Sequence, residues 1–560
     1  MESKIIKNRV RIWYMFCFLC LGIIDQRRGS AIGQIQMTFS NLTGIVIAMM
    51  LVPSLKVKKF LEKKYGYWTI VCIPISILIA IIGSKYWVYQ GQWVTAVLNV
   101  VVWSYLIIYI WDNRNELNVL SKICRPYIIC AIVMLSLMIF SVHGWAVPLW
   151  HLMIYGGFYL IGIPNEKRRT FLDGMLDGII IWFFVLQIIA FGFRPYDYIR
   201  YHGLYAGETQ NGLFYMLVCC AFLIKWMEAK EKKQKFLSFF FFFMAAGCIS
   251  FTLFTGSRAA LMGIAIVTLV VTVYYDIISI KKIGQWVLHG GALILCIAIT
   301  VPIVYGCIRY LPTILHHPVW FQGEYESGRS ICSFDSWNSD KYITFDEAME
   351  SNIGRILRVI GIDYDAIEKK WSENMGVLKV VAAELDNEDA FTSKNLKEEA
   401  GQSPDNPYRV VGIDIADGVM GARKVIYSYY LHRLNFVGHK SSEAVFYLED
   451  GTEIGHAHNM FIQIAYSYGV AAGGLFLLIY LHGIIHAFYH GRRANFIGGV
   501  FLVAILCFGL VEMVITPGQI TVPIMGIFLF FNEECGKEAK NYSLRQPWML
   551  KVRTRMQIIL

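Results

Sequence analysis

Two histidines and an asparagine stand together in the run His456-Ala457-His458-Asn459. The run closes a long polar stretch and directly precedes an apolar one, so we expect it at the rim of a membrane, where a helix begins. Because an imidazole can take up a proton near neutral pH, His458 is a candidate general base. His456 is a candidate substrate ligand or a residue that orders the loop. Asn459 is a second candidate ligand, or the cap of the helix that follows.

The spacing of the two histidines would also suit a metal ion. Zinc sites in proteins take at least three protein ligands, and no third ligand lies nearby in the sequence. We therefore predict a site without metal and without any other cofactor.

A possible anion site lies at Thr255-Gly256-Ser257-Arg258. Gly256 can end one apolar helix and Ser257 can cap the next, which leaves Arg258 in its first turn. A helix start has free amide hydrogens and a partial positive charge, and a guanidinium matches the geometry of phosphate oxygens. The alternative is an arginine that reaches lipid phosphates at the membrane surface.

Two further basic positions come with polar neighbours. Arg200 precedes Glu208 and Asn211, so the arginine could bind an anion while the glutamate accepts a proton or a sugar hydroxyl. The alternative is a solvated loop in which Asn211 caps a helix. Arg423 follows in Gly421-Ala422-Arg423-Lys424, where an exposed basic pair on a helix is the simpler interpretation. Glu512 is an acid inside an apolar run, and such acids are candidates for function.

The elements that position these residues are apolar helices. The chain has 560 residues, of which 56% are hydrophobic and 16% charged. Repeated apolar stretches of about 17–20 residues are long enough to cross a bilayer. The first follows basic residues as a signal peptide would, but lacks a cleavage site, so we interpret it as a retained span. Fourteen spans are predicted, at 10–24, 38–55, 67–84, 94–111, 126–142, 146–163, 174–193, 211–226, 236–254, 259–275, 286–308, 459–480, 495–515 and 519–531.

Charge predicts the orientation of these spans. With the N-terminus inside, the cytoplasmic segments collect thirty lysines and arginines, counting Arg11 and Lys225 at the cytoplasmic ends of their spans, and the short outer loops six. This bias is the one that the positive-inside rule describes. It places both termini in the cytoplasm and residues 309–457 outside. The net charge of +10 belongs to the membrane part, since the outer loop holds 24 of the 41 acids and 15 of the 51 bases. Nucleic acid is therefore a poor candidate partner.

The chain divides into spans one to eleven (1–308), a loop domain (309–457), spans twelve to fourteen (458–531) and a basic cytoplasmic tail (532–560). A loop of this length must have its own fold. Thr344 and Glu347 form a capping-box pattern before a helical repeat, and Asp417 could cap a second helix. The charged part within 372–412 is predicted to be mobile. The fold class is thus an all-α polytopic membrane protein with one large, mainly helical, extracytoplasmic domain.

Taken in order, these motifs resemble the O-antigen ligase and polymerase family of bacterial membrane glycosyltransferases. The matching pieces are Arg200…Gly203…Asn211, Thr255-Gly256-Ser257-Arg258, Gly421-Ala422-Arg423-x-x-Ile426-Tyr427 with Gly438, and His458-Asn459-x-Phe461-x-Gln463 ending in Gly469. They cover about residues 170–480. The chain departs from the family at His439-Lys440-Ser441, where members often repeat glycine, and its outer loop is long.

The resemblance implies a GT-C-like fold in the cytoplasmic membrane and an undecaprenyl-diphosphate-linked glycan as donor, without a required metal. It implies arginines at the diphosphate and a histidine near the acceptor hydroxyl. These roles fall on Arg258, Arg423 and Arg200, and on His458. The acceptor would be a glycan or a lipid, and partners in a polysaccharide assembly pathway are expected.

The motifs leave open whether the enzyme polymerises glycan or, as a ligase proper, transfers finished glycan to a lipid or protein. We favour a polymerase because nothing in the sequence marks a lipid or protein acceptor. A hypothesis from another class is a transporter or lipid-glycan flippase. That class would place charged groups at mid-membrane and show broken helices.

Overall fold

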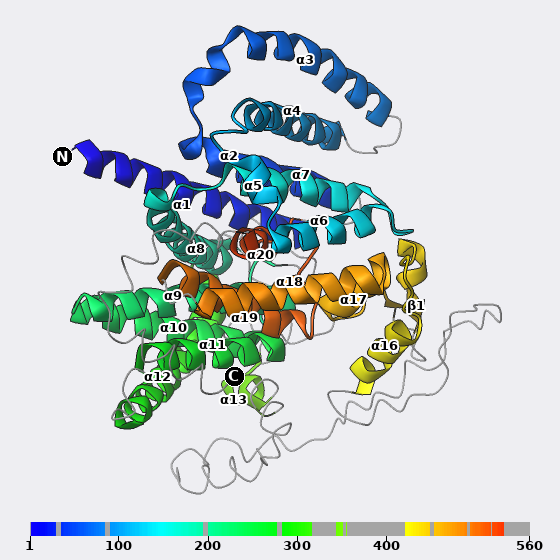
Figure 1. Ribbon diagram of the computed structural model, residues 1–560. Coiled ribbons are helices and arrows are strands. Elements are labelled where there is room, and N and C mark those ends of the chain that lie inside the picture. The colour runs from blue at the N-terminus through cyan, green and yellow to red at the C-terminus, as the bar shows by residue number, and fades with distance from the viewer. Residues whose placement is uncertain are drawn as a thin grey trace, which may run out of the picture.

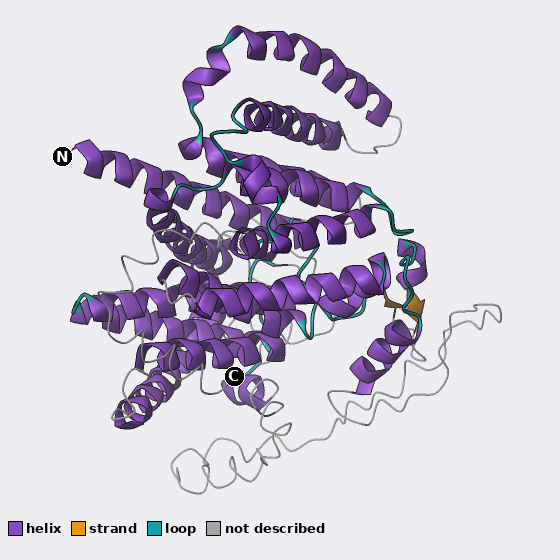
Figure 2. Cartoon of the chain, viewed as in Figure 1, coloured by secondary structure: helices purple, strands orange, loops and turns teal. Residues whose placement is uncertain are grey.

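The structure is a computed structural model, and almost all of what it describes is helix (Figure 2). One exception is a short antiparallel pair of strands, β1 (Phe446–Tyr447) and β2 (Glu453–Ile454), in the loop domain. The structure describes residues 2–29, 35–84, 90–193, 200–205, 207–276, 283–315, 343–350, 354, 421–447, 453–489, 493–516 and 518–530.

Every apolar run that we predicted as a span is helical over most of its length. The prediction for 495–515 is wrong at its end, since the helix there stops at Gly509 and Glu512 lies in the segment that follows. Long apolar runs form helices in a membrane because helices satisfy their own backbone hydrogen bonds. The helices are α1 (Glu2–Gly29), α2 (Ile35–Leu51), α3 (Lys63–Ser84), α4 (Gln90–Asp112), α5 (Val119–Ile123), α6 (Pro126–Ile139), α7 (Ala146–Ile161), α8 (Asn165–Phe193), α9 (Glu208–Glu231), α10 (Lys235–Thr255), α11 (Arg258–Asp276), α12 (Ile283–Leu315), α13 (Phe345–Met349), α16 (Gly421–His432), α17 (Met460–Tyr468), α18 (Val470–Tyr489), α19 (Arg493–Gly509) and α20 (Thr521–Phe530).

Six helices in the described part of the chain are long and apolar enough to cross a membrane. They comprise most or all of α4, α8, α9, α10, α12 and α18. Other apolar helices are shorter, at 10–17 residues. The molecule therefore has the helices of a membrane-embedded protein, whereas the count of fourteen crossings and the GT-C-like arrangement stay predictions.

Helix α9 forms the centre of the bundle. Its residues from Asn211 to Ala229 are all buried, and α8, α10, α11 and α19 pack around it. Helix α1 packs on α8 through two glycines, because a Cβ at Gly174 or Gly178 would lie 2.8 or 2.7 Å from carbonyl oxygens of α1. Helices α3 and α4 lie at one edge of the molecule and α16 at another (Figure 1).

One end of the bundle collects segments that are far apart in the sequence. Gln26, near the end of α1, donates a hydrogen bond to the carbonyl of Leu204 at 2.6 Å. Its neighbour Asp25 accepts one from the backbone of Ile520 at 3.1 Å. The end of α1 therefore holds together the segment before α9 and the segment before α20. We call this the site end of the bundle.

The twelfth predicted span, 459–480, is in fact two helices. Gly469, with a φ of +99°, separates α17 from α18. The segment after α16 lies against this break, since the backbone of Val470 donates to Asn435 at 2.9 Å. A Cβ at Gly469 would lie 2.1 Å from the carbonyl oxygen of Phe436, and one at Gly438 would lie 2.1 Å from that of Ser467. Two glycines thus let the loop domain dock on the broken helix.

The loop domain is described only in part. The predicted capping box is confirmed, since the Thr344 hydroxyl accepts from the Glu347 backbone and the Glu347 carboxylate from that of Thr344. The predicted second helix is confirmed as α16, from Gly421, whereas Asp417, its predicted cap, lies outside the described residues. Helix α12 continues to Leu315, beyond the predicted end of span eleven. Residues 372–412 and 532–560, predicted as mobile and as a basic tail, lie outside the described residues.

Candidate functional site

Asn459 fixes the backbone that carries the two histidines. Its side-chain oxygen accepts hydrogen bonds from Phe461 and Ile462 at 3.0 and 3.1 Å, so it caps α17. Its amide also donates to the carbonyl of Leu510 at 2.8 Å. The expected cap is confirmed, and the start of α17 is joined to the segment that follows α19. The alternative role of Asn459 as a substrate ligand stays a prediction.

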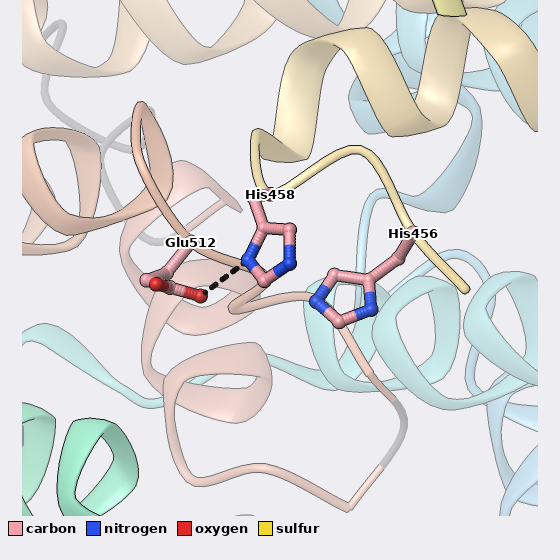
Figure 3. A group of neighbouring side chains, drawn as sticks. All are labelled: His456, His458 and Glu512. Carbon is pink, nitrogen blue, oxygen red and sulfur yellow. Dashed lines mark hydrogen bonds and ion pairs between the residues drawn. The ribbon is translucent and has the colours of Figure 1, made fainter. Parts of the chain in front are cut away.

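His458 is paired with the acid that the sequence placed inside an apolar run. Its Nδ1 lies 3.1 Å from Oε2 of Glu512. Figure 3 shows the His458 ring between the Glu512 carboxylate and the His456 ring. His458 has a φ of +46°, a left-handed conformation that is uncommon for residues other than glycine. A carboxylate on Nδ1 orients an imidazole and leaves Nε2 as its other polar atom.

Arg423 shares the same carboxylate. Its Nη2 donates to Oε1 of Glu512 at 3.1 Å. One turn later on α16, the Tyr427 hydroxyl lies within hydrogen-bond distance of the carbonyls of His458 and Leu510, at 3.2 and 3.1 Å. Helix α16 therefore brings Arg423 to the histidine through Glu512. Two of the three candidate catalytic residues, His458 and Arg423, lie in one cluster.

His456 lies beside His458, with ring centroids 4.1 Å apart. Burial, and then the charge of His458, lower the pKa of His456 to about 4, so it stays uncharged at neutral pH. The backbone of Ala457, the residue between the two histidines, donates a hydrogen bond to the side-chain oxygen of Gln463 at 2.7 Å.

The prediction of no metal was based on the lack of a third ligand near the histidines in sequence. The fold brings one, because single ligand atoms of His456, His458 and Glu512 all lie within 4.8 Å of one another.

Arg200, Glu208 and Asn211 form a second cluster, at the start of α9. Arg200 pairs with the carboxylate of Glu208 and donates from Nε to the carbonyl of Thr255 at 2.9 Å. His202 lies 3.2 Å from the other oxygen of Glu208. The proposed cap role of Asn211 is wrong, since Gly207 precedes the helix and Asn211 is buried inside it. Its amide instead donates to the carbonyl of Tyr201 at 3.3 Å.

Gly256 and Arg258 take their predicted places, whereas Ser257 differs. Gly256 ends α10 with a φ of +60°, and Arg258 is the first residue of α11. The Ser257 side chain was expected to cap α11, but it is buried and its hydroxyl has no hydrogen-bond partner among the described residues. It packs against Gly212, where a Cβ would lie 2.5 Å from that of Ser257. This contact fixes the start of α11 against α9.

The two clusters belong to the same end of the bundle. Leu204, four residues after Arg200, is joined to Ile520 through Gln26 and Asp25 of α1. Helix α11 packs on α19, with Gly263 close to the carbonyl of Ala504, and Glu512 follows α19. The site end therefore carries Arg200 of the second cluster, Arg258 at the start of α11, and the cluster around Glu512.

Sequence reasoning did not identify Tyr427 or Gln463 as residues that hold the site together. Tyr427 lies four positions after Arg423 on one helix, a spacing that places both on the same face. That spacing was the available signal. The pairing of Glu512 with residues 54 and 89 positions away had none.

No protein-family model matches the chain, and neither a curated protein nor a solved structure matches it significantly. The resemblance to the O-antigen ligase and polymerase family is therefore based on the short motifs and their order.

Proposed function

We propose that this protein is a membrane glycosyltransferase that uses a polyprenyl-diphosphate-linked glycan, of the undecaprenyl class, as donor. In this proposal it works at the outer face of the cytoplasmic membrane, in the assembly of a surface polysaccharide. The observation that carries the proposal is the shared carboxylate of Glu512, which lies 3.1 Å both from His458 and from Arg423. It joins a candidate base to a candidate diphosphate ligand.

The pairing with Glu512 suits His458 for the role of base. A carboxylate at Nδ1 fixes the ring and stabilises its charged form after proton uptake, and this is the logic of hydrolase triads. In the proposed step, the acceptor hydroxyl loses its proton to His458 as its oxygen attacks the anomeric carbon. The bond from that carbon to the diphosphate oxygen breaks at the same time. One displacement of this kind inverts the anomeric configuration.

The arginines suit the leaving group. A guanidinium has five N–H donors, and one donor of Arg423 goes to the Glu512 oxygen, so in this proposal other donors of Arg423 bind phosphate oxygens. Arg258 stands at the start of α11, where free backbone amides add positive potential. Positive groups fixed in a water-poor place stabilise the charge that develops on a leaving diphosphate.

An apolar cavity beside the cluster suits the lipid part of such a donor. It has a volume of about 270 Å³ and lies among α6, α7, α17, α18 and α20. Gln463, Met513 and Thr516 are on its wall, so it adjoins the loop that carries Glu512. Polyprenyl chains are apolar, whereas a nucleotide sugar would need a polar site.

The test uses purified full-length protein in lipid with a polyprenyl-diphosphate oligosaccharide as donor. The proposal predicts glycan transfer that Glu512→Gln lowers strongly, because the amide removes the charge that supports His458. Glu443→Gln, at a half-buried acid elsewhere in the loop domain, should transfer normally. A Glu512→Gln enzyme with full activity would contradict the proposed roles. Products that lengthen glycan would indicate a polymerase, and transfer to a separate lipid or protein would indicate a ligase.

A transporter or lipid-glycan flippase is the second candidate, and two observations favour it. Lys225 of α9 lies 2.9 Å from Asp177 of α8, which also pairs with Arg11 of α1, so charges lie between apolar helices. Helix interruption, as at Gly469, also occurs at transporter substrate sites. Vesicles that move lipid-linked glycan across the bilayer without forming a new glycosidic bond would favour this candidate.

A further inference from the structure

His456, His458 and Glu512 make a donor set for a metal ion. Each side chain offers one ligand atom, and these atoms all lie within 4.8 Å of one another. All three side chains are half-buried, so they are neither freely hydrated nor sealed from ions. Figure 3 shows the three groups gathered, with the two rings side by side and the carboxylate on the far side of His458.

The chemistry of this set matches zinc. Two imidazoles and one carboxylate are the protein ligands of a class of zinc sites that keep a fourth position open. Zinc bonds of about 2.0–2.2 Å place tetrahedral ligand atoms about 3.3–3.6 Å apart. One pair, His458 Nδ1 and Glu512 Oε2, is already at 3.1 Å. Small rotations of the side chains would bring in His456.

Hydrogen bonds fix the backbone that carries the two histidines. Ala457, between them, donates to Gln463 at 2.7 Å, and Asn459 caps α17. Groups that fix the ligands in this way raise metal affinity, because less freedom is lost on binding. Arg423 opposes it, since its guanidinium lies 3.1 Å from a Glu512 oxygen and repels a cation. These effects together favour a reversible site over a structural one.

We propose that His456, His458 and Glu512 bind a divalent transition metal ion of the zinc class, and that the bound ion inhibits glycan transfer. The inhibition is based on the function proposed above. An ion at this place takes the lone pair of His458 and the carboxylate of Glu512, so the imidazole can no longer accept the proton of the acceptor. The metal site itself does not depend on that function.

Metal binding is measured first, without any activity assay. Full-length protein in detergent is stripped with chelator and titrated with Zn²⁺ against a coloured competitor. Wild-type protein should bind one ion at this site, and His456→Gln and Glu512→Gln should each weaken that binding at least about tenfold, because even the loss of a group that only orients a ligand costs about 10–100-fold. The control is His432→Gln, because His432 is exposed on α16 and hydrogen-bonds with Ser428, so this variant should bind zinc as wild type does. Equal binding by wild type and His456→Gln overturns the site.

Inhibition is measured next, as the ratio of transfer with and without Zn²⁺ within each variant. The ratio should fall well below one in wild type and return toward one in His456→Gln. Stimulation by Zn²⁺ would overturn both the inhibitory role and the metal-independent chemistry of the proposed function. Binding that depends on His456, in a protein without transfer activity, would support the metal site and overturn the proposed function.

Discussion

His458 combines a chemical demand with a conformational one. Its Nδ1 faces Glu512 while its backbone has a φ of +46°. Few side chains adopt this left-handed region, and asparagine, aspartate and histidine are the more common ones besides glycine. Substitution at this position therefore changes the stability of the loop as well as its chemistry, and a test must separate the two.

We predict that His458→Ala lowers glycan turnover by about two to four orders of magnitude, the usual contribution of a general base. His458→Asn should lower turnover equally while it keeps the thermal midpoint, because asparagine accepts the left-handed backbone. Binding of the lipid-diphosphate donor should persist in both, since the arginines remain. Turnover near that of wild type in the asparagine variant would make the histidine dispensable, and the arginines would then be the main catalytic groups.

For single residues, the sequence predicted which ones belong to the candidate site better than it predicted which of them contact one another. His458, Arg423 and Glu512 were each chosen on local grounds, and the structure brings them together. Their pairing depends on contacts over 54 and 89 positions, which no local pattern encodes. For the same reason the sequence did not indicate Glu512 as the third ligand of the proposed metal site, because Glu512 follows α19 whereas the histidines precede α17. Asn211 was misassigned because the helix begins three residues earlier, at Glu208.

Single helices carry the candidate arginines to the site. Arg258 begins α11, whose start is fixed by the packing of Ser257 against Gly212. Arg423 lies in the first turn of α16, which Tyr427 holds to the His458 segment. The position of each guanidinium thus depends on helix packing and not on a flexible loop.

We predict that Arg258→Ala and Arg423→Ala each abolish measurable glycan transfer while the protein level in the membrane stays unchanged. Lysine should restore activity poorly at either position, because an ammonium lacks the two-pronged geometry of a guanidinium. Lys424→Ala is the matched control, since exposed Lys424 lies next to Arg423 on α16. Transfer at the wild-type rate by both alanine variants would remove the arginines from the site.

The break between α17 and α18 gives a prediction about stability. Gly469→Ala should destabilise the protein by about 2–4 kcal/mol, because alanine is strained at a φ of +99° and its Cβ would clash with the Phe436 carbonyl. Gly474→Ala is the control, since a Cβ there meets nothing within 4 Å. It should be neutral or stabilise α18 by up to about 1 kcal/mol. Thermal midpoints in one detergent would compare them, and equal midpoints would show that the docking is unimportant.

Helices were predictable and their interruptions were not. Apolar length alone predicts a helix, and every predicted span is helical over most of its length. The residues from 459 to 480 form one continuous apolar run, so hydropathy gave no reason to divide it. The reason is tertiary, because Gly469 adopts its conformation where the backbone of Phe436 comes close. The strand pair β1–β2 was missed likewise, since two residues per strand are too few for a pattern.

The whole molecule has a predicted orientation, which follows from its basic residues. In a protein without other cysteines, Lys440→Cys should react with a membrane-impermeant thiol reagent on intact cells. Lys58→Cys should react only after the membrane is opened. Both lysines are exposed in the structure, so accessibility within the fold is matched. Reaction at Lys58→Cys and protection at Lys440→Cys on intact cells would reverse the orientation.

The hydrogen bond between Asp25 and Ile520 joins residues 495 positions apart, and this separation has a consequence for biosynthesis. Helix α1 leaves the ribosome long before residue 520 is made, so the hydrogen bond of Asp25 cannot form until then. Glu512 and Leu510 are likewise synthesised 54 and 51 residues after their partners His458 and Asn459. The arrangement around Glu512 can therefore form only after the chain has grown past residue 512. Until then, a growing chain holds His458 without the carboxylate that we propose as its catalytic partner.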